Sequence, residues 1–194
     1  MNFIGEYQLE DTSVCDKLIE YFESSDRRLP GAIGNGSVDT DIKESTDVCI
    51  WPHEMEEEGN EAVLNFMIAL DKVLDSYIED YPECNKYGSW SIQESLQIQK
   101  YLPGQGYKAW HTERVNSATN VSRRHLTFMV YLNDVPDGGT EFKLQNLTVE
   151  AKKGKVVFWP VDWTHTHRGV VSETQTKYII SGWFNYLPLE LSQG

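Results

Sequence analysis

The sequence predicts an α+β fold that is mainly β, in which N-terminal helices support a C-terminal β-roll of the jelly-roll class. Helical apolar patterns occur in the first half of the 194-residue chain. After residue 88, short runs rich in β-branched and aromatic residues alternate with glycine, proline and aspartate, as in sandwiches and barrels. The length suits one domain. We therefore expect residues 1–88 to form helical and irregular support for a β-roll core at residues 89–194.

The first helix is predicted over residues 11–24, where capping residues precede apolar residues at helical spacing. A longer helix is predicted from residue 60, and Pro82 ends it because proline lacks a backbone N–H. Its apolar face consists of Val63, Phe66, Met67, Leu70, Leu74, Tyr77 and Ile78. Residues 30–47 combine glycine, proline and charge with little periodicity, which predicts a loop with one short strand.

The strands of the β-roll are predicted at the runs SLQIQKYL, HLTFMVYLN, KVVFWP and KYIISGWFNY. Each is short and rich in residues that favour a pleated, half-buried surface. The separating turn residues give the regular spacing of an all-β core.

The formal charge of −13, from 17 basic and 30 acidic residues, disfavours both non-specific nucleic-acid binding and docking on anionic membrane surfaces. No run is long enough to span a membrane. The start, MNFIGEYQLED, has neither the basic nor the apolar region of a signal peptide. The 3 cysteines, Cys15, Cys49 and Cys84, show no disulfide or zinc spacing. We expect a cytoplasmic protein in a reducing compartment.

Candidate metal ligands occur in the stretch YKAWHTERVN. His111 and Glu113 are separated by one residue, so on an extended chain their side chains leave from the same face. A third ligand is available from His165 or His167 in VDWTHTHRGVV. Two histidines and one carboxylate are typical of non-haem Fe(II) oxygenases. Zinc hydrolases use the same ligand types, so these residues alone leave the metal open.

Lys177 lies ten residues after His167 and leads into a strand that is otherwise strongly apolar. If its side chain points inward, it needs an anionic partner, which a bound dicarboxylate would supply. The alternative is a lysine that marks the exposed end of the strand, since lysine is rarely buried.

The segment from Leu96 to Tyr186 resembles the catalytic half of the Fe(II)/2-oxoglutarate-dependent dioxygenases, in their prolyl 4-hydroxylase-like branch. The similar stretches occur in order: LQIQKYLPGQGYKAWHTE, FMVYLNDVPDGGTEF, AKKGKVVFWP and HRGVVSETQTKYIISGWF. They cover about half of the chain. The resemblance implies a double-stranded β-helix (jelly roll) that carries the site.

The resemblance also implies roles for particular residues. The catalytic Fe(II) ligands would be His111, Glu113 and His167, the last chosen over His165 because of Gly169 and the interval to Lys177. Lys177 would pair with the distal carboxylate of 2-oxoglutarate. The remaining cosubstrate contacts would be Tyr101, Tyr131 and Thr140, with Trp183 forming a wall of the site.

The implied reaction is hydroxylation of a substrate by O₂, with release of succinate and CO₂ and with ascorbate as a further candidate cofactor. The branch suggests a peptidyl proline in a peptide or protein substrate. Polar loops on rigid sheets often carry recognition, and the segment RVNSATNVSRR supplies Arg114, Arg123 and Arg124 for an acidic target.

One residue departs from the family pattern, because Glu113 stands where the family usually has aspartate. Glutamate is one methylene longer and has an additional torsion. This departure keeps open an alternative, a non-catalytic metal-binding jelly-roll interaction module, with a zinc hydrolase as a third possibility. The sequence leaves the oligomeric state open.

Overall fold

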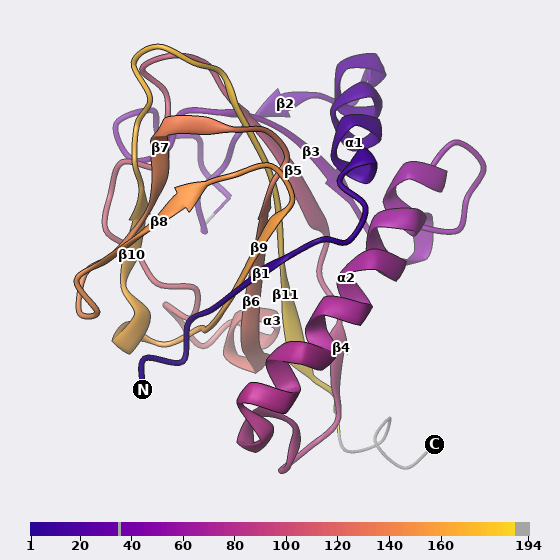
Figure 1. Cartoon of the computed structure of the whole chain (residues 1–194), viewed down its shortest axis with the longest axis vertical. Helices are drawn as coiled ribbons and strands as arrows, with labels where there is room; N and C mark the ends of the chain where they lie inside the picture. Colours follow the sequence, from indigo (N-terminus) through magenta and orange to yellow (C-terminus); the bar gives the residue numbers. More distant parts are fainter. Residues whose placement is uncertain (35, 189–194) are drawn as a thin grey trace.

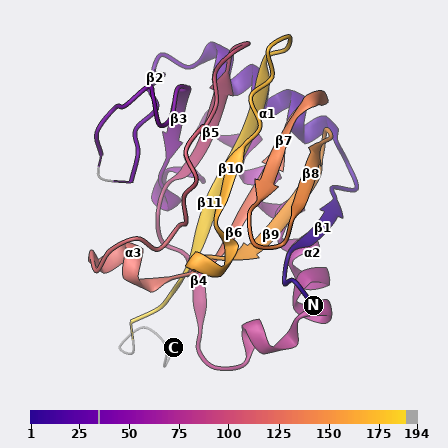
Figure 2. The same ribbon diagram turned by 90° about the vertical axis from the view of Figure 1, so that its left-hand side faces the viewer.

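In the computed structural model, which describes residues 1–34 and 36–188, the elements form three layers (Figure 1). Helices α1 (Ser13–Ser24) and α2 (Glu61–Asp80) cover one face of a large sheet. A smaller sheet lies on the other side, toward the viewer in Figure 2. The predicted mainly β chain with N-terminal helices is confirmed, and both helices lie where the periodicity predicted them.

The large sheet is antiparallel at every pairing found among the described strands. Its order is β1 (Gly5–Gln8), β9 (Lys155–Pro160), β6 (Arg124–Tyr131), β11 (Lys177–Tyr186), β5 (Leu96–Tyr101), β3 (Thr46–Ile50) and β2 (Leu29–Pro30), with β4 (Trp90–Ile92) paired to β11. The N-terminal region therefore contributes β1, β2 and β3 to this sheet as well as its supporting helices.

The small sheet has the order β10 (His167–Gly169), β7 (Val135–Phe142) and β8 (Leu147–Ala151), also antiparallel. Short helical turns connect the strands: α3 (Thr119–Arg123), η1 (Pro52–Glu54), η2 (Pro82–Asn85) and η3 (Trp163–His165). Gly139 allows β7 to lie close to β8, since a Cβ there would come within 2.1 Å of the Val149 carbonyl oxygen.

The large sheet is buried on both faces, which explains its near-continuous apolar runs. Successive side chains of a strand point to opposite faces. In β6, Phe128 and Val130 join the core beneath the helices, whereas Met129 and Tyr131 join a second core on the side of the small sheet. The same alternation lets one strand stabilise the fold on one face and line a cleft on the other.

Two further expectations can be compared with the structure. Cys15, Cys49 and Cys84 are free thiols in the structure. No helix among the described residues combines the length and the apolar character needed to cross a membrane.

Candidate functional site

A cleft of about 390 Å³ opens on the face of the large sheet that is turned away from the helices. Apart from Arg124 at the start of β6, the lining residues from the large sheet all have odd numbers, because alternate residues of a strand share a face. These residues are Gln97, Gln99, Tyr101, Thr127, Met129, Tyr131, Trp159, Lys177, Ile179, Ser181 and Trp183. Two other parts of the fold complete the walls. They are the segment that contains His111 and Glu113, and the small sheet, which contributes Thr140 and His167.

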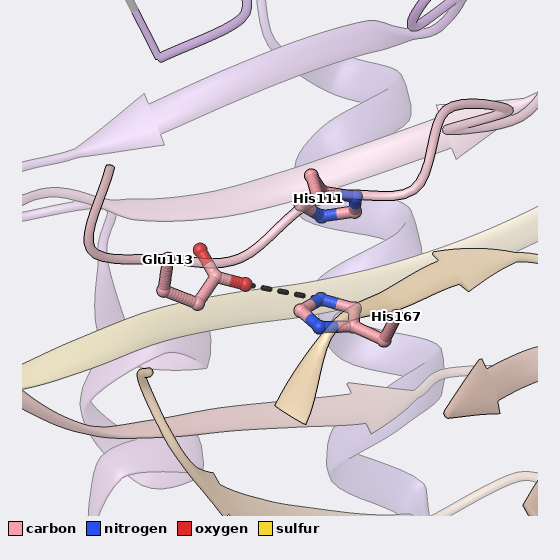
Figure 3. Close-up of side chains that lie close together, drawn as sticks. All are labelled: His111, Glu113 and His167. Atoms are coloured by element: carbon pink, nitrogen blue, oxygen red, sulfur yellow. Dashed lines mark ion pairs between the residues drawn. The ribbon is translucent and has the colours of Figure 1, made fainter. Parts of the chain in front are cut away.

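Three potential metal ligands that line the cleft converge at one point, called the metal end below, and Figure 3 shows their side chains close together. His111, Glu113 and His167 each offer a donor atom, and these atoms lie within 4.8 Å of one another. Nε2 of His167 is 3.2 Å from Oε1 of Glu113. No other group of three histidine, cysteine or acidic side chains meets this criterion within the described part of the chain.

The backbone positions the two histidines. His111 and His167 form an isolated antiparallel bridge, in which each N–H donates to the other's carbonyl oxygen at 3.0 and 2.9 Å. Each ring Nδ1 lies beside the carbonyl oxygen two residues earlier, 3.0 Å from Ala109 and 2.8 Å from His165. We assign the proton to Nδ1 in both rings, which leaves both Nε2 lone pairs free for a metal.

The electrostatics of the cluster suit a divalent cation. Burial and the neighbouring His167 lower the pKa of His111 to about 4, so this imidazole is neutral at pH 7. Burial opposes ionisation of Glu113, but the neighbouring imidazoles of His167 and His111 and the Arg124 guanidinium lower the pKa of its carboxyl. Two imidazoles and a carboxylate are the donor set of the facial triad, and the residues present fit Fe(II).

The cleft also contains a buried cation, Lys177, whose surroundings are called the lysine end below. Lys177 is 4% exposed, and its Nζ donates to the Val170 carbonyl oxygen at 2.7 Å and lies 5.4 Å from the Tyr101 ring centroid. None of the described carboxylates forms a salt bridge with it. Burial lowers the pKa of Lys177 to about 8. Lys177 therefore points inward, and its ammonium lacks the anionic partner that a buried charge requires.

Tyr101, Tyr131 and Thr140 are buried and also line the cleft. The hydroxyls of Tyr131 and Thr140 lie 2.7 Å apart, and Tyr101 donates a hydrogen bond to the side-chain carbonyl of Gln99. The structure thus brings all the site residues singled out in the sequence to one cleft. Their binding roles remain predictions.

Sequence analysis did not select Tyr107 or Gln99, which also line the cleft. The Tyr107 ring stacks on His111, with centroids 3.6 Å apart and an interplanar angle of 10°. Gln99 bonds to Tyr101 and, at 2.9 Å, to the Ser181 hydroxyl. Their spacing from predicted site residues could have identified them. Tyr107 precedes His111 by four residues and Gln99 precedes Tyr101 by two, and even intervals in an extended chain put side chains on the same face.

His165 and His167, which are separated by one threonine, have different roles in the structure. Nε2 of His165 lies 2.9 Å from the backbone oxygen of Asn2, so its side chain secures the N-terminus. Only its carbonyl oxygen supports the cluster, through Nδ1 of His167. The choice of His167 as the converging residue agrees with this geometry.

The polar segment after Glu113 differs from a simple basic loop. It contains helix α3. Arg114 forms a 2.7 Å salt bridge with Asp162, and Arg124 forms a 2.6 Å salt bridge with Glu94. These pairs balance two of the three arginine charges that the sequence suggested for an acidic target.

Comparisons with known proteins agree with this geometry. The family model described as the 2OG-Fe(II) oxygenase superfamily matches residues 96–185, the segment that contains every predicted site residue. No curated protein sequence matches the chain.

Similar solved structures include a viral collagen prolyl hydroxylase from Paramecium Bursaria Chlorella virus-1, with 18% identity, a TM-score of 0.67, and coverage of 95% of this chain and 97% of that one. A Trichoplax adhaerens prolyl hydroxylase bound to a hypoxia inducible factor peptide has 17% identity, a TM-score of 0.70, and coverage of 96% and 84%. A Pseudomonas putida prolyl-4-hydroxylase has 18% identity, a TM-score of 0.69, and coverage of 97% and 95%. At these identities the likeness shows a shared fold.

Proposed function

We propose that the chain is a 2OG-Fe(II) oxygenase that uses Fe(II), 2-oxoglutarate and O₂ to hydroxylate a peptidyl proline, and the match of residues 96–185 to that family model supports this proposal. Succinate and CO₂ are the other products. The observation that carries the proposal is the convergence of His111, Glu113 and His167 in a cleft that also contains an unpaired buried lysine.

We assign the metal end of the cleft to Fe(II), with His111, Glu113 and His167 as its ligands. When bound, Fe(II) with 2-oxoglutarate and O₂ supplies the oxidative decarboxylation that adds one oxygen atom to a C–H bond of the substrate. His111, Glu113 and His167 would hold the metal through two imidazole nitrogens and one carboxylate. The neutral His111 and the ionised Glu113 are the forms that bind a metal without first losing a proton.

We assign the other end to 2-oxoglutarate. Lys177 would bind its distal carboxylate, because a carboxylate supplies the counter-ion that the buried ammonium lacks. Tyr101, Tyr131 and Thr140 would offer hydroxyl groups along the same cosubstrate. Their burial also keeps bulk water away from the reacting atoms.

We further propose that the two facing sheets form a double-stranded β-helix, the jelly roll expected from the resemblance. The large and small sheets lie on opposite sides of the cleft, and the site residues come from both. This arrangement supports a cofactor site inside the mouth of a β-roll.

The choice of proline as the substrate residue rests on the similar solved structures. Each of those described above is named as a prolyl hydroxylase, and one contains a peptide. Those chains are 17–18% identical to this one, so the assay below measures the substrate residue directly.

The test is an assay of proline-containing peptides with Fe(II), 2-oxoglutarate and ascorbate. We expect succinate formation coupled to a gain of one oxygen atom on proline, detected by mass spectrometry, and neither product from a His167→Ala variant. Succinate with no oxidised peptide from any proline sequence would contradict the proline assignment. Absence of both succinate and an anaerobic Fe(II)–2-oxoglutarate charge-transfer band would favour the non-catalytic interaction module.

A further inference from the structure

The two carboxylate oxygens of Glu113 have different partners. Oε1 lies 3.2 Å from Nε2 of His167, and Figure 3 shows it directed toward that ring. Oε2 accepts a 2.9 Å hydrogen bond from Nε1 of Trp183. An indole N–H is a donor only, so it holds Oε2 without competing for a metal. The hydrogen bond leaves Oε1 as the oxygen that faces the two histidines.

Trp183 is itself held by Arg124. The guanidinium carbon of Arg124 lies 3.6 Å from the centroid of the Trp183 ring, which is a close cation–π contact. The same guanidinium donates to the backbone oxygen of Glu113 at 2.8 Å. Arg124 therefore contacts both the backbone of the carboxylate residue and the ring that holds its side chain.

A second carboxylate fixes Arg124 in turn. Its Nε and NH2 groups donate to the two oxygens of Glu94 at 2.8 and 2.6 Å. Asn185 donates to the same carboxylate at 2.8 Å. A bidentate arginine–carboxylate pair has a defined geometry and a strong charge-assisted component. The chain of contacts from Glu94 to Glu113 is therefore rigid and largely buried.

This support reaches Glu113 only because its side chain is long. From one backbone position, Oε1 faces His167 while Oε2 meets Trp183. Aspartate is one methylene shorter, so its carboxylate cannot keep both contacts without a shift of the backbone. Arg124 opposes such a shift through its bond to the Glu113 carbonyl.

We propose that Trp183 and Arg124 are positioning residues that hold Glu113 as a one-oxygen metal ligand, and that this support is matched to glutamate rather than aspartate. The inference rests on the proposed function, because it takes Glu113 as a metal ligand. It explains how the chain accommodates glutamate at a position where aspartate is usual in the family it resembles.

The test is a double-mutant cycle on metal affinity, using Co(II) as an O₂-stable probe in the absence of 2-oxoglutarate. Trp183→Phe keeps an aromatic ring beneath Arg124 and removes the N–H together with part of the indole ring system. We expect Co(II) binding to weaken about 10- to 100-fold, the usual effect of removing such an outer contact. We also expect the Co(II) absorption spectrum to change, because the freed oxygen becomes available to the metal.

The cycle is completed with Glu113→Asp and with the double variant. Since Glu113→Asp already loses the indole contact, adding Trp183→Phe should weaken binding by less than about twofold further. Two results would overturn the inference. One is a loss of Co(II) affinity in the double variant equal to the product of the two single losses, and the other is a Trp183→Phe variant with the Co(II) affinity and spectrum of the wild type. Trp163→Phe is the matched control, because that ring is 70% exposed and lies outside the cleft.

Two further measurements keep the result interpretable. If thermal melting shows that Trp183→Phe is unfolded, Arg124→Lys replaces it, and unchanged Co(II) affinity in that variant would overturn the proposal. Failure of the proposed function has a separate signature, because wild-type protein would then fail to bind Co(II), or His167→Ala would bind it equally well.

Discussion

The two ends of the cleft differ in how their charges are balanced. At the metal end, the Glu113 carboxylate has His167, Trp183 and Arg124 around it, and both histidines have backbone partners. At the other end, the Lys177 ammonium has a carbonyl oxygen and an aromatic ring but no carboxylate among the described residues. The metal end is organised before any ligand binds, whereas the lysine end remains unbalanced.

This difference indicates that binding of an anion at Lys177 should stabilise the folded protein more than its new contacts alone would. A buried charge without a counter-ion destabilises the folded state. An anion that reaches Lys177 removes this penalty as well as forming a new contact. The metal end gains instead from geometry that is already set. The two ends should therefore respond differently when a single side chain is removed.

The largest expected effect is at the metal end. Replacing His167 by Ala removes one of the converging donors, and we expect metal affinity to fall more than about 100-fold, because two remaining ligands bind a divalent cation weakly. Isothermal titration with Mn(II) or Co(II) measures the change.

His165→Ala is the matched control for this variant. It should keep metal affinity within about threefold while melting at a lower temperature, since His165 secures Asn2 and contributes only a backbone oxygen to the cluster. Equal loss of metal binding in both variants would mean that the two histidines are not distinguished as the structure indicates.

An intermediate effect is expected at the lysine end. Lys177→Met keeps most of the side-chain volume and removes the charge. We expect the apo protein to gain about 1 to 3 kcal/mol in free energy of unfolding, because an unpaired buried ammonium is lost. Affinity for 2-oxoglutarate should fall roughly 10- to 100-fold, which corresponds to one charge-assisted hydrogen bond. Chemical denaturation and 2-oxoglutarate titration measure the two quantities.

Metal affinity in the absence of 2-oxoglutarate is the internal control for Lys177→Met, and it should remain at the wild-type level. A variant that loses stability, or that binds 2-oxoglutarate as tightly as wild type, would show that the two ends do not differ in the way described above.

The family resemblance implied the roles of the site residues, and local spacing predicted which of them share a face. His111 and Glu113 share a face at a spacing of two, and the odd-numbered positions of β11 place Lys177 and Trp183 on the cleft face of the sheet. The helices and the central strands were likewise marked by periodicity and turn residues. These features depend on neighbours within a few residues along the chain.

What the sequence did not reveal depends on contacts between distant segments. The bridge between His111 and His167 joins residues 56 positions apart in the numbering, and Trp183 reaches Glu113 across 70 positions. Pairing of the N-terminal strands with the large sheet is also a tertiary choice. That His111, Glu113 and His167 would meet was expected from the family resemblance, because residue spacing alone carries no signal for contacts between segments this far apart.

The smallest expected effect is a response to pH that only the lysine end should show. Burial holds the pKa of Lys177 at about 8, below its ordinary 10.5. Between these values the unfolded chain binds more protons at this position, so Lys177 makes apo stability rise with pH across this window. A bound carboxylate restores the charged form and raises the pKa again. Affinity for 2-oxoglutarate should therefore be constant below about pH 8 and weaken by up to about tenfold per unit above it.

Lys177→Met isolates this response from other groups that titrate in the same range. The difference between wild type and variant should show 2-oxoglutarate affinity falling and apo stability rising from pH 8 to 10. Titration and denaturation at matched ionic strength measure both slopes. A wild-type affinity that is flat to pH 10, or that falls equally in Lys177→Met, would place the pH response elsewhere and remove the contrast between the two ends of the cleft.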